Sequence, residues 1–400
     1  MKSSIAHFIL CLTLSTSVLS GCEEDDPVEN NPTPSAGASG SAGGGQAGTA
    51  GSGQAGNSGT GGSAGSGGDS GTGGSAGSSG SAPVCEVSKD DYQPRVDGSQ
   101  KDTWPACVSD GNSYVQVEAN ISTLARIEAF EKIAQRLGFG TTKVPTPVEF
   151  VDSLSDYTVP EGLESRVARR EDEHYPPASK KCQDMTVEEL AANKDRCVGP
   201  AQIAPLLKAA FEGGAKGEEP RLNAARIEAG LLWFLFMSVY KEAVTCANVP
   251  KDCDSSLAYY TGSVVRDDAK GLAKYVKALE QETHDRIFDG NLAVRCWRDL
   301  DKGSAGQVQE PELRARALAQ LDKALHKGVA AVVKAQLGQL ESPTGDAARI
   351  HVDLLGRSLL REAKVRDAAK AAILEAELNK LPNPDVKAAT EALDALFPCP

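Results

Sequence analysis

Hydrophobic residues in the C-terminal three quarters of the chain recur every three or four positions, which is the period of an α-helix. The first such run is Tyr114, Val117, Ile121, Leu124, Ile133 and Leu137. Gly138 follows it and supplies a residue suited to a left-handed helix stop. The pattern predicts a helix that ends at Gly138. No segment shows the strict alternation of apolar and polar residues that is typical of a half-buried strand.

Helix boundaries are marked further along the chain. Thr186 and Glu189 form a capping-box pattern that predicts a short helix, and Gly213-Gly214 predicts the end of another. Pro220 predicts the start of a long helix over residues 221–246. Residues 231–237 of that helix are apolar on all sides, and so short an apolar run cannot cross a membrane. We therefore expect a buried central helix.

The same periodicity predicts helices over residues 268–299, 312–340, 346–380 with a break, and 385–397. Together these segments predict an all-α fold of about eight to ten helices, packed as one bundle or two.

The N-terminus has the features of an export signal. Lys2 precedes an apolar run over residues 5–19, which is too short to span a bilayer. The run ends at Leu19-Ser20-Gly21-Cys22, which resembles the lipobox of bacterial lipoproteins. The resemblance implies that residues 1–21 are a lipoprotein signal peptide and that Cys22 is acylated. Glu23 after this Cys favours the outer membrane, and an ordinary signal peptide with an incidental Cys is the alternative.

A long segment of low complexity follows the signal. It is acidic at residues 23–26 and consists almost wholly of Gly, Ser and Ala over residues 34–82. Such a composition has too little apolar surface to offset the entropy of ordering the chain. Residues 22–83 are therefore predicted to be a disordered linker that tethers an all-helical extracytoplasmic domain at residues 84–400.

The cysteines predict disulfide bonds. Ten are present, of which Cys11 lies within the signal and Cys22 at its end. An even number in an exported chain favours disulfides. The spacing of Cys246 and Cys253 suggests a local bridge, and Cys182 and Cys197 flank a short predicted helix. A zinc site would need paired C-x-x-C motifs, which the sequence lacks. The remaining pairings stay open among Cys85, Cys107, Cys182, Cys197, Cys246, Cys253, Cys296 and Cys399.

A short pattern recurs early in three predicted helices and leads to one metal hypothesis. It reads Ala-Arg-Ile-Glu at residues 125–128 and 225–228, and Ala-Arg-Ile-His at 348–351. If these helices are duplicates, Glu128, Glu228 and His351 face one core and provide ligands for iron or another divalent metal. In the alternative, the recurrence is chance and the acidic residues face water.

Two further pairs have the spacing of metal ligands on one helix face, namely Glu280 with His284 and Asp322 with His326. On an acidic protein such pairs are more often ordinary surface contacts, and we interpret them so. His174 lies in a charged run over residues 169–174, which we interpret as a solvated helix end.

Adjacent tyrosines at Tyr259 and Tyr260 precede a Gly-Ser turn, and a phenolate is a known type of ferric ligand. In the plainer interpretation, one ring packs inward, the other lies at the surface, and Gly262 stops the helix. The stretch from Ala258 to Ser263 resembles the algal low-iron-inducible periplasmic iron-assimilation family. The resemblance implies iron handling outside the cytoplasm, with Tyr259 and Tyr260 near the site.

These observations argue against some classes of function but do not identify one. The net charge of −13 and the absence of a basic stripe argue against nucleic-acid partners. The sequence has no His-Glu-x-x-His motif and no P-loop, so an enzyme is not favoured. We expect a lipid-anchored cell-envelope protein whose helical domain binds a ligand, with iron or another divalent metal the most concrete cofactor. The alternative is a non-enzymatic structural or protein-interaction lipoprotein with an envelope protein as its partner.

Overall fold

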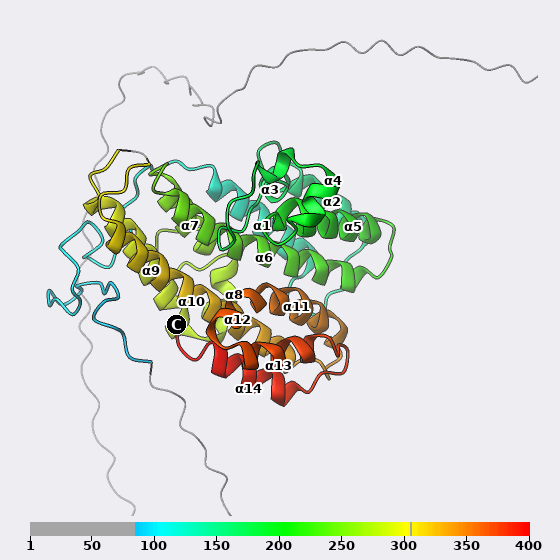
Figure 1. Ribbon diagram of the computed structural model, residues 1–400. Coiled ribbons are helices and arrows are strands. Elements are labelled where there is room, and N and C mark those ends of the chain that lie inside the picture. Colours follow the sequence, from blue (N-terminus) through cyan, green and yellow to red (C-terminus); the bar gives the residue numbers. More distant parts are fainter. Residues whose placement is uncertain (1–84, 305) are drawn as a thin grey trace, which may run out of the picture. The chain divides into compact units, whose positions relative to one another are not determined.

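The computed structural model describes residues 85–304 and 306–400, and every regular element in these residues is a helix (Figure 1). The prediction of an all-α fold is confirmed. These residues contain fourteen α-helices, more than the eight to ten expected, because two long predicted helices are divided and the helices at residues 147–157 and 163–167 were not predicted. The predicted signal peptide at residues 1–21, the acylated Cys22 and the linker at residues 22–83 lie outside the described residues.

The bounds of the helices, including one 3₁₀ turn (η1) and one π turn (η2), are as follows. They are α1 (Thr123–Leu137), α2 (Pro147–Tyr157), α3 (Leu163–Val167), η1 (Cys182–Asp184), α4 (Val187–Ala192), η2 (Gly199–Ile203), α5 (Ala204–Ala215), α6 (Pro220–Thr245), α7 (Asp252–Thr261), α8 (Leu272–Leu279), α9 (Gln281–Leu300), α10 (Pro311–Leu337), α11 (Gly345–Ser358), α12 (Leu360–Arg366), α13 (Ala368–Leu378) and α14 (Val386–Leu396).

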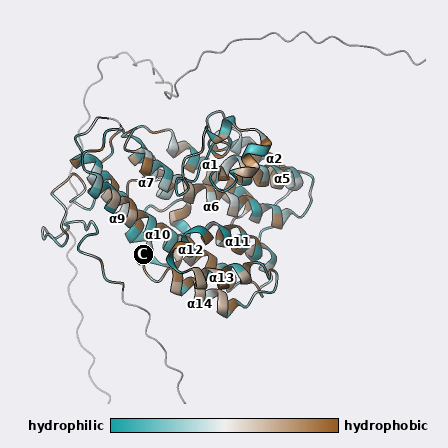
Figure 2. Ribbon diagram, in the orientation of Figure 1, coloured by the Kyte–Doolittle hydropathy of each residue, from teal (hydrophilic) through white to brown (hydrophobic). Residues whose placement is uncertain are grey.

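Helix α6 is the central element of the core. It packs against α5, α7, α10 and α11, and residues 231–237 are all buried, as predicted. Figure 2 colours α6 and the helices around it by hydropathy. By length and composition alone α6 is long and apolar enough to cross a membrane, but 89% of its most apolar window is buried within the protein. That burial is typical of a core helix.

The predicted boundary signals act where they were expected. Gly138 ends α1 in the left-handed conformation, with φ of 68°. Thr186 and Glu189 form both hydrogen bonds of the capping box at the start of α4. Pro220 occupies the first position of α6, where its missing N–H costs no helical hydrogen bond.

Residues 114–121, which were predicted to begin the first helix, are not helical. The carboxylate of Asp254 on α7 accepts hydrogen bonds from the backbone amides of Val117 (2.9 Å) and Glu118 (2.7 Å). These two amides therefore donate to a side chain on α7 and not to backbone carbonyls, as they would inside a helix. Of its periodic apolar residues, Tyr114 and Ile121 are buried, whereas Val117 is exposed.

Two other boundaries differ from the prediction, and the break expected within residues 346–380 is present. The helix expected over residues 268–299 divides at Glu280, which is extended, into α8 and α9. The break in the segment 346–380 includes Asp367, whose side chain caps α13. Helix α5 passes through Gly213 and Gly214 because the absent side chain of Gly214 leaves room for Phe150; a Cβ there would lie 2.3 Å from the Phe150 ring.

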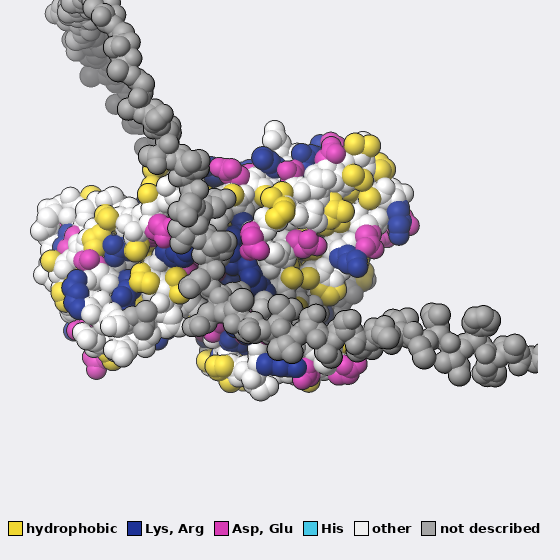
Figure 3. Space-filling model, turned by 90° about the horizontal axis from the view of Figure 1, so that it is seen from above, with side chains coloured by type: hydrophobic (Ala, Val, Ile, Leu, Met, Phe, Trp, Pro, Cys, Tyr) yellow, Lys and Arg dark blue, Asp and Glu magenta, His cyan; other side chains and the backbone are white. Residues whose placement is uncertain are grey.

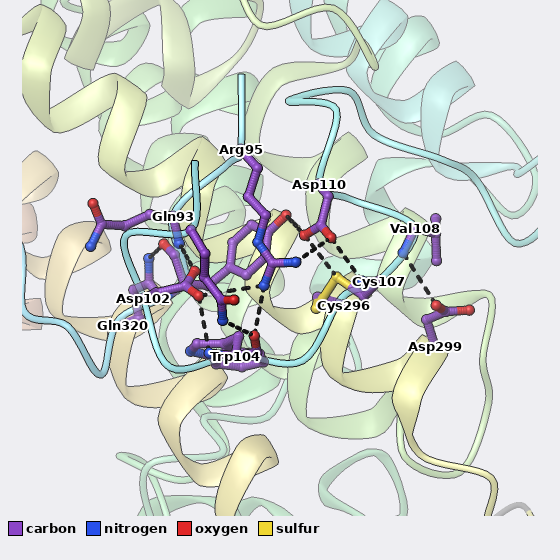
Figure 4. Close-up of a disulfide and its surroundings, with 12 residues drawn as sticks. Gln93, Arg95, Asp102, Trp104, Cys107, Val108, Asp110, Cys296, Asp299 and Gln320 are labelled. Carbon is purple, nitrogen blue, oxygen red and sulfur yellow. Dashed lines mark hydrogen bonds and ion pairs between the residues drawn. A yellow bond between two sulfur atoms is a disulfide. The ribbon is translucent and has the colours of Figure 1, made fainter. Parts of the chain in front are cut away.

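All eight predicted cysteines form disulfides. Cys246 pairs with Cys253 and Cys182 with Cys197, as their spacing suggested, while the other pairs are Cys107–Cys296 and Cys85–Cys399. The Cys107–Cys296 bond attaches the non-helical segment 85–122 to α9 (Figure 4). Around it Arg95 forms an ion pair with Asp110 at 2.9 Å. The Cys107–Cys296 and Cys85–Cys399 bonds thus secure the non-helical segment 85–122, while Cys246–Cys253 joins the end of α6 to α7.

Candidate metal centre

The hypothesis built on the recurring pattern brings two of its three residues together. Glu228 on α6 and His351 on α11 are both buried, and Nε2 of His351 lies 3.4 Å from Oε2 of Glu228. Tyr275 on α8 donates its hydroxyl to Oε1 of Glu228 at 2.8 Å, and the amide of Gly140 donates to Oε2 at 3.2 Å. Glu228 therefore has three partners from three parts of the chain.

The expectation that Glu128 faces the same core is wrong. Its side chain is exposed, whereas its neighbours Arg126 and Ile127 on α1 are buried. The three segments therefore do not share one environment, because the helix face that carries Glu228 inward carries Glu128 outward. The pair that remains supplies two metal ligands.

The contact between Glu228 and His351 is a buried ion pair. Burial alone would raise the pKa of Glu228, but His351 and the hydroxyl of Tyr275 lower it below its usual value. Burial alone would lower the pKa of His351, but the carboxylate of Glu228 raises it. Nδ1 of His351 donates to the carbonyl of Ala347 at 3.0 Å, so each ring nitrogen has a polar neighbour.

The ion pair between Glu228 and His351 predicts that the free energy of unfolding depends on pH. The raised pKa of His351 adds stability that is present below its unfolded value of 6.5 and is lost as pH rises through the folded value. The lowered pKa of Glu228 adds stability that is present above its unfolded value of 4.5 and is lost as pH falls through the folded value. We expect the His351→Gln variant to lose more free energy of unfolding at about pH 5.5 than at about pH 10, by about 1 kcal/mol or more.

Urea unfolding of the wild type and the variant at both pH values measures this difference. His284→Gln is a suitable control because burial lowers, rather than raises, the pKa of His284. An equal loss at the two pH values in His351→Gln would show that His351 contributes packing alone.

Tyr259 and Tyr260 are both buried, so the interpretation that one ring lies at the surface is wrong. Nε2 of His284 lies 2.8 Å from the carbonyl of Arg266, which can only accept, so this nitrogen carries the proton. Nδ1 therefore accepts the hydroxyl of Tyr260 at 2.9 Å. The ring of Tyr259 packs edge-on against Phe234. Tyr275, rather than either of the adjacent tyrosines, is the tyrosine that contacts Glu228.

The interpretation of Glu280 and His284 as a surface pair is also wrong. His284 is fully buried. Glu280 instead accepts the hydroxyl of Thr283 at 2.7 Å and forms an ion pair with Lys327 at 3.4 Å.

His174, Asp322 and His326 form a second cluster. It offers three potential metal ligands, whereas Glu228 and His351 offer two. The potential ligand atoms of His174, Asp322 and His326 all lie within 4.8 Å of one another. Oδ1 of Asp322 is 2.9 Å from Nε2 of His174 and 3.0 Å from Nδ1 of His326. Two imidazoles and one carboxylate therefore converge on one point from segments that are 148 residues apart.

Helix packing sets the positions of these three side chains. Asp322 and His326 are four residues apart on α10 and so share one face of the helix. His174 lies in the loop after α3, where its ring stacks on Tyr240 of α6 at 3.9 Å with an interplanar angle of 8°. The ring of His326 packs edge-on against Phe236, also on α6. Helix α6 thus forms an aromatic wall behind the cluster.

These positions overturn two of our interpretations. His174 is not a solvated helix end, because its side chain is only 6% exposed. Asp322 and His326 are not an ordinary surface pair, because His326 is buried and Asp322 also contacts His174. Part of the Asp322 side chain, 18%, does reach solvent, which leaves one side of the cluster accessible.

His174 lies between two carboxylates. Its Nδ1 is 2.6 Å from Oδ1 of Asp172, while Nε2 faces Asp322. Burial would lower the pKa of His174, but the hydrogen bonds to Asp172 and Asp322 raise it to about 9. Burial would raise the pKa of Asp322, but the imidazoles of His326 and His174 hold it well below its usual range. In the absence of a metal, a proton on each nitrogen of His174 links the two acids.

The same geometry fits a metal ion. Ligand atoms about 2.1 Å from a tetrahedral metal lie about 3.4 Å apart, so the observed separations of 2.9 and 3.0 Å need to widen only slightly. Asp172 occupies the position of the outer carboxylate that commonly orients a metal-binding imidazole through its other nitrogen. Binding at Nδ1 of His326 would replace its present hydrogen bond to the carbonyl of Asp322, which is 2.9 Å long.

Comparisons with protein-family models, with curated proteins and with solved structures find no match to this chain.

Proposed function

We propose that the helical domain binds one divalent transition-metal ion through His174, Asp322 and His326. The observation that supports this most strongly is the convergence of two imidazoles and one carboxylate at hydrogen-bond distances in a largely buried position. We expected a divalent metal at Glu128, Glu228 and His351; the proposed ion is of the same class, but its ligands lie on α10 and in the loop after α3.

The donor set favours some metals over others. Imidazole nitrogen suits iron, zinc, copper and nickel, whereas magnesium and calcium prefer all-oxygen sites. Two histidines and one carboxylate with open positions are the ligand set of non-haem Fe²⁺ and of zinc sites that keep exchangeable ligands. We therefore propose Fe²⁺ or Zn²⁺ as the occupant.

The proposed setting is the cell envelope. An acyl chain on Cys22 anchors the protein to the membrane, in our proposal the outer membrane, and the segment at residues 22–83 tethers the domain. A metal site on such a tether would serve metal capture or storage outside the cytoplasm. Each methylene of the acyl chain that is buried in the membrane contributes about 0.8 kcal/mol to the free energy of membrane binding.

Metal analysis of the exported chain tests the proposal. The protein is purified from an oxidising compartment without chelators, stripped, and titrated with Zn²⁺ or, anaerobically, with Fe²⁺. We expect binding of about one ion per chain and a rise in the melting temperature with metal concentration, since an ion that binds only the folded state stabilises it by mass action. Calorimetry that shows no uptake, together with an unchanged melting temperature, would exclude the metal function.

A rival function, a protein-interaction module, has one observation in its favour. Val144, Val148 and Val151 on and before α2 have exposed fractions of 59%, 66% and 50%. On the face drawn in Figure 3, however, hydrophobic side chains are interspersed with charges of both signs. A protein that takes up no metal would leave this rival as the better account.

A further inference from the structure

Two arginines near the candidate metal centre have little compensation for their charge. Arg314 on α10 donates Nη2 to the carbonyl of Val244 at 3.0 Å, and its Nε is buried without a hydrogen-bond partner among the described residues. No carboxylate in the described part of the chain lies within ion-pair distance of Arg314. Arg361 on α12 lies 3.9 Å from Oε2 of Glu362. That carboxylate pairs more closely with Arg366, whose Nε donates to Oε1 at 2.8 Å.

Packing of α6 against α10 sets the position of Arg314. At one end, Phe236 of α6 packs against His326 of α10. About two turns further along α6, Val244 accepts the hydrogen bond from Arg314, which lies about three turns before His326. Tyr240 lies midway between these two contacts, and therefore between the metal ligands and Arg314.

The hydroxyl of Tyr240 lies near charges of both signs. Its pKa is raised to about 12, by burial first and by the carboxylate of Asp322 second, while Arg361 and Arg314 act in the opposite direction. One proposed metal ligand and both arginines are therefore close to the same hydroxyl group.

Arg361 lies at the accessible side of the centre. Its guanidinium is over the ring of Tyr175, 5.2 Å from the ring centre, and Tyr175 directly follows His174 in the chain. The side chain of Arg361 is 35% exposed, and part of Asp322 also reaches solvent. A small molecule from solution can therefore approach the metal ligands and Arg361 from the same side.

The balance of charge indicates what such a molecule would carry. The two charges of a bound divalent ion would be offset by its ligand Asp322 and by Asp172, which contacts His174. The charges of Arg314 and Arg361 would then remain in a partly buried place, where cations without counter-charges are costly. Three protein ligands also leave a coordination position open on the ion. An anion with two acidic groups would satisfy both the ion and the arginines.

We infer that the centre binds its metal ion together with a small dicarboxylate, one carboxylate of which ligates the ion while the other pairs with Arg361 and Arg314. The rise of about 12 Å between Asp322 and Arg314 along α10 favours a ligand longer than a single carboxylate. The inference rests on the proposed metal function and adds the form in which the ion is held, a complex of metal and dicarboxylate.

Titration of the Co²⁺-loaded full exported chain with succinate tests the inference. Co²⁺ accepts the same imidazole and carboxylate ligands, and its visible absorption bands change when a new ligand enters the coordination sphere. At constant ionic strength we expect succinate to shift the bands and to bind about tenfold or more tightly than acetate, which has a single carboxylate.

Two arginine variants and one control locate the second carboxylate. Arg361→Gln should weaken succinate binding by about tenfold and leave acetate binding unchanged, because it removes a charge-assisted hydrogen bond. Arg314→Gln should have a similar effect. Arg357→Gln is the matched control, since Arg357 on α11 is exposed and pairs with Asp353 at 2.6 Å, and it should bind succinate as the wild type does.

The possible failures of the two proposals are distinguishable. A chain that shows no bands of protein-bound Co²⁺ would remove the metal function and this inference together. Bands that succinate leaves unchanged, equal affinities for succinate and acetate, or equal succinate affinities in the wild type and in Arg361→Gln would each overturn the inference and leave the metal function standing.

Discussion

Replacing Glu242 with Leu is expected to lower the free energy of unfolding by about 3–5 kcal/mol, because the change leaves the buried guanidinium of Arg170 without its counter-charge. Nη1 of Arg170 donates to Oε1 of Glu242 at 3.0 Å, and both side chains are buried. The guanidinium lies over the rings of Phe234 and Tyr259, at 5.3 and 5.4 Å, so it cannot reach water without disturbing the core. Arginine does not lose its proton in proteins, so Arg170 cannot become neutral when its counter-charge is removed.

Chemical unfolding measures this effect. Glu391→Leu is a control, because Glu391 on α14 is exposed and its contact with Lys387 is a surface pair worth little. The double variant Arg170→Met with Glu242→Leu should recover much of the loss, since a buried pair is often replaceable by apolar residues of similar volume. A loss in Glu242→Leu no larger than that in Glu391→Leu would refute the assignment of a buried ion pair.

Replacing Asp322 with Ala is expected to weaken metal binding by at least about 100-fold. Asp322 supplies the only carboxylate among the three proposed ligands and contacts both imidazoles. Asp172→Asn should have a smaller effect, about 10- to 100-fold, because Asp172 orients His174 without touching the ion. The two variants thus give a graded series that a purely structural hydrogen-bond network would not produce.

Competition titrations with a chromophoric chelator measure these affinities. His351→Gln is the matched control, because it removes a buried imidazole from the Glu228–His351 ion pair and leaves the His174 cluster intact. Equal weakening by His351→Gln and Asp322→Ala would contradict the assignment of the ligands.

The fold class was predictable because helix formation leaves a local signal. The apolar period, the capping box at Thr186 and the proline at Pro220 each act within a few residues. The non-helical state of residues 114–121 was not predictable, since it depends on tertiary contacts such as the one between Asp254 and the amide of Glu118. The division at Glu280 left no signal that we recognised in the sequence.

The site was predictable only in part. The spacing of Asp322 and His326 gave a real signal, but nothing in the sequence connects them with His174, which is 148 residues from Asp322. Packing of the loop after α3 against Tyr240 creates that contact. Likewise, the recurring pattern identified Glu228 and His351 but could not show which face of α1 carries Glu128.

X-ray absorption spectroscopy of the Zn²⁺-loaded protein tests the metal assignment most directly. We predict scattering from two imidazole rings and from oxygen ligands, at the usual zinc distances of about 2.0–2.2 Å, with one imidazole lost in His326→Ala. A spectrum without imidazole scattering, or one that is identical in His326→Ala and in the wild type, would contradict the centre formed by His174, Asp322 and His326.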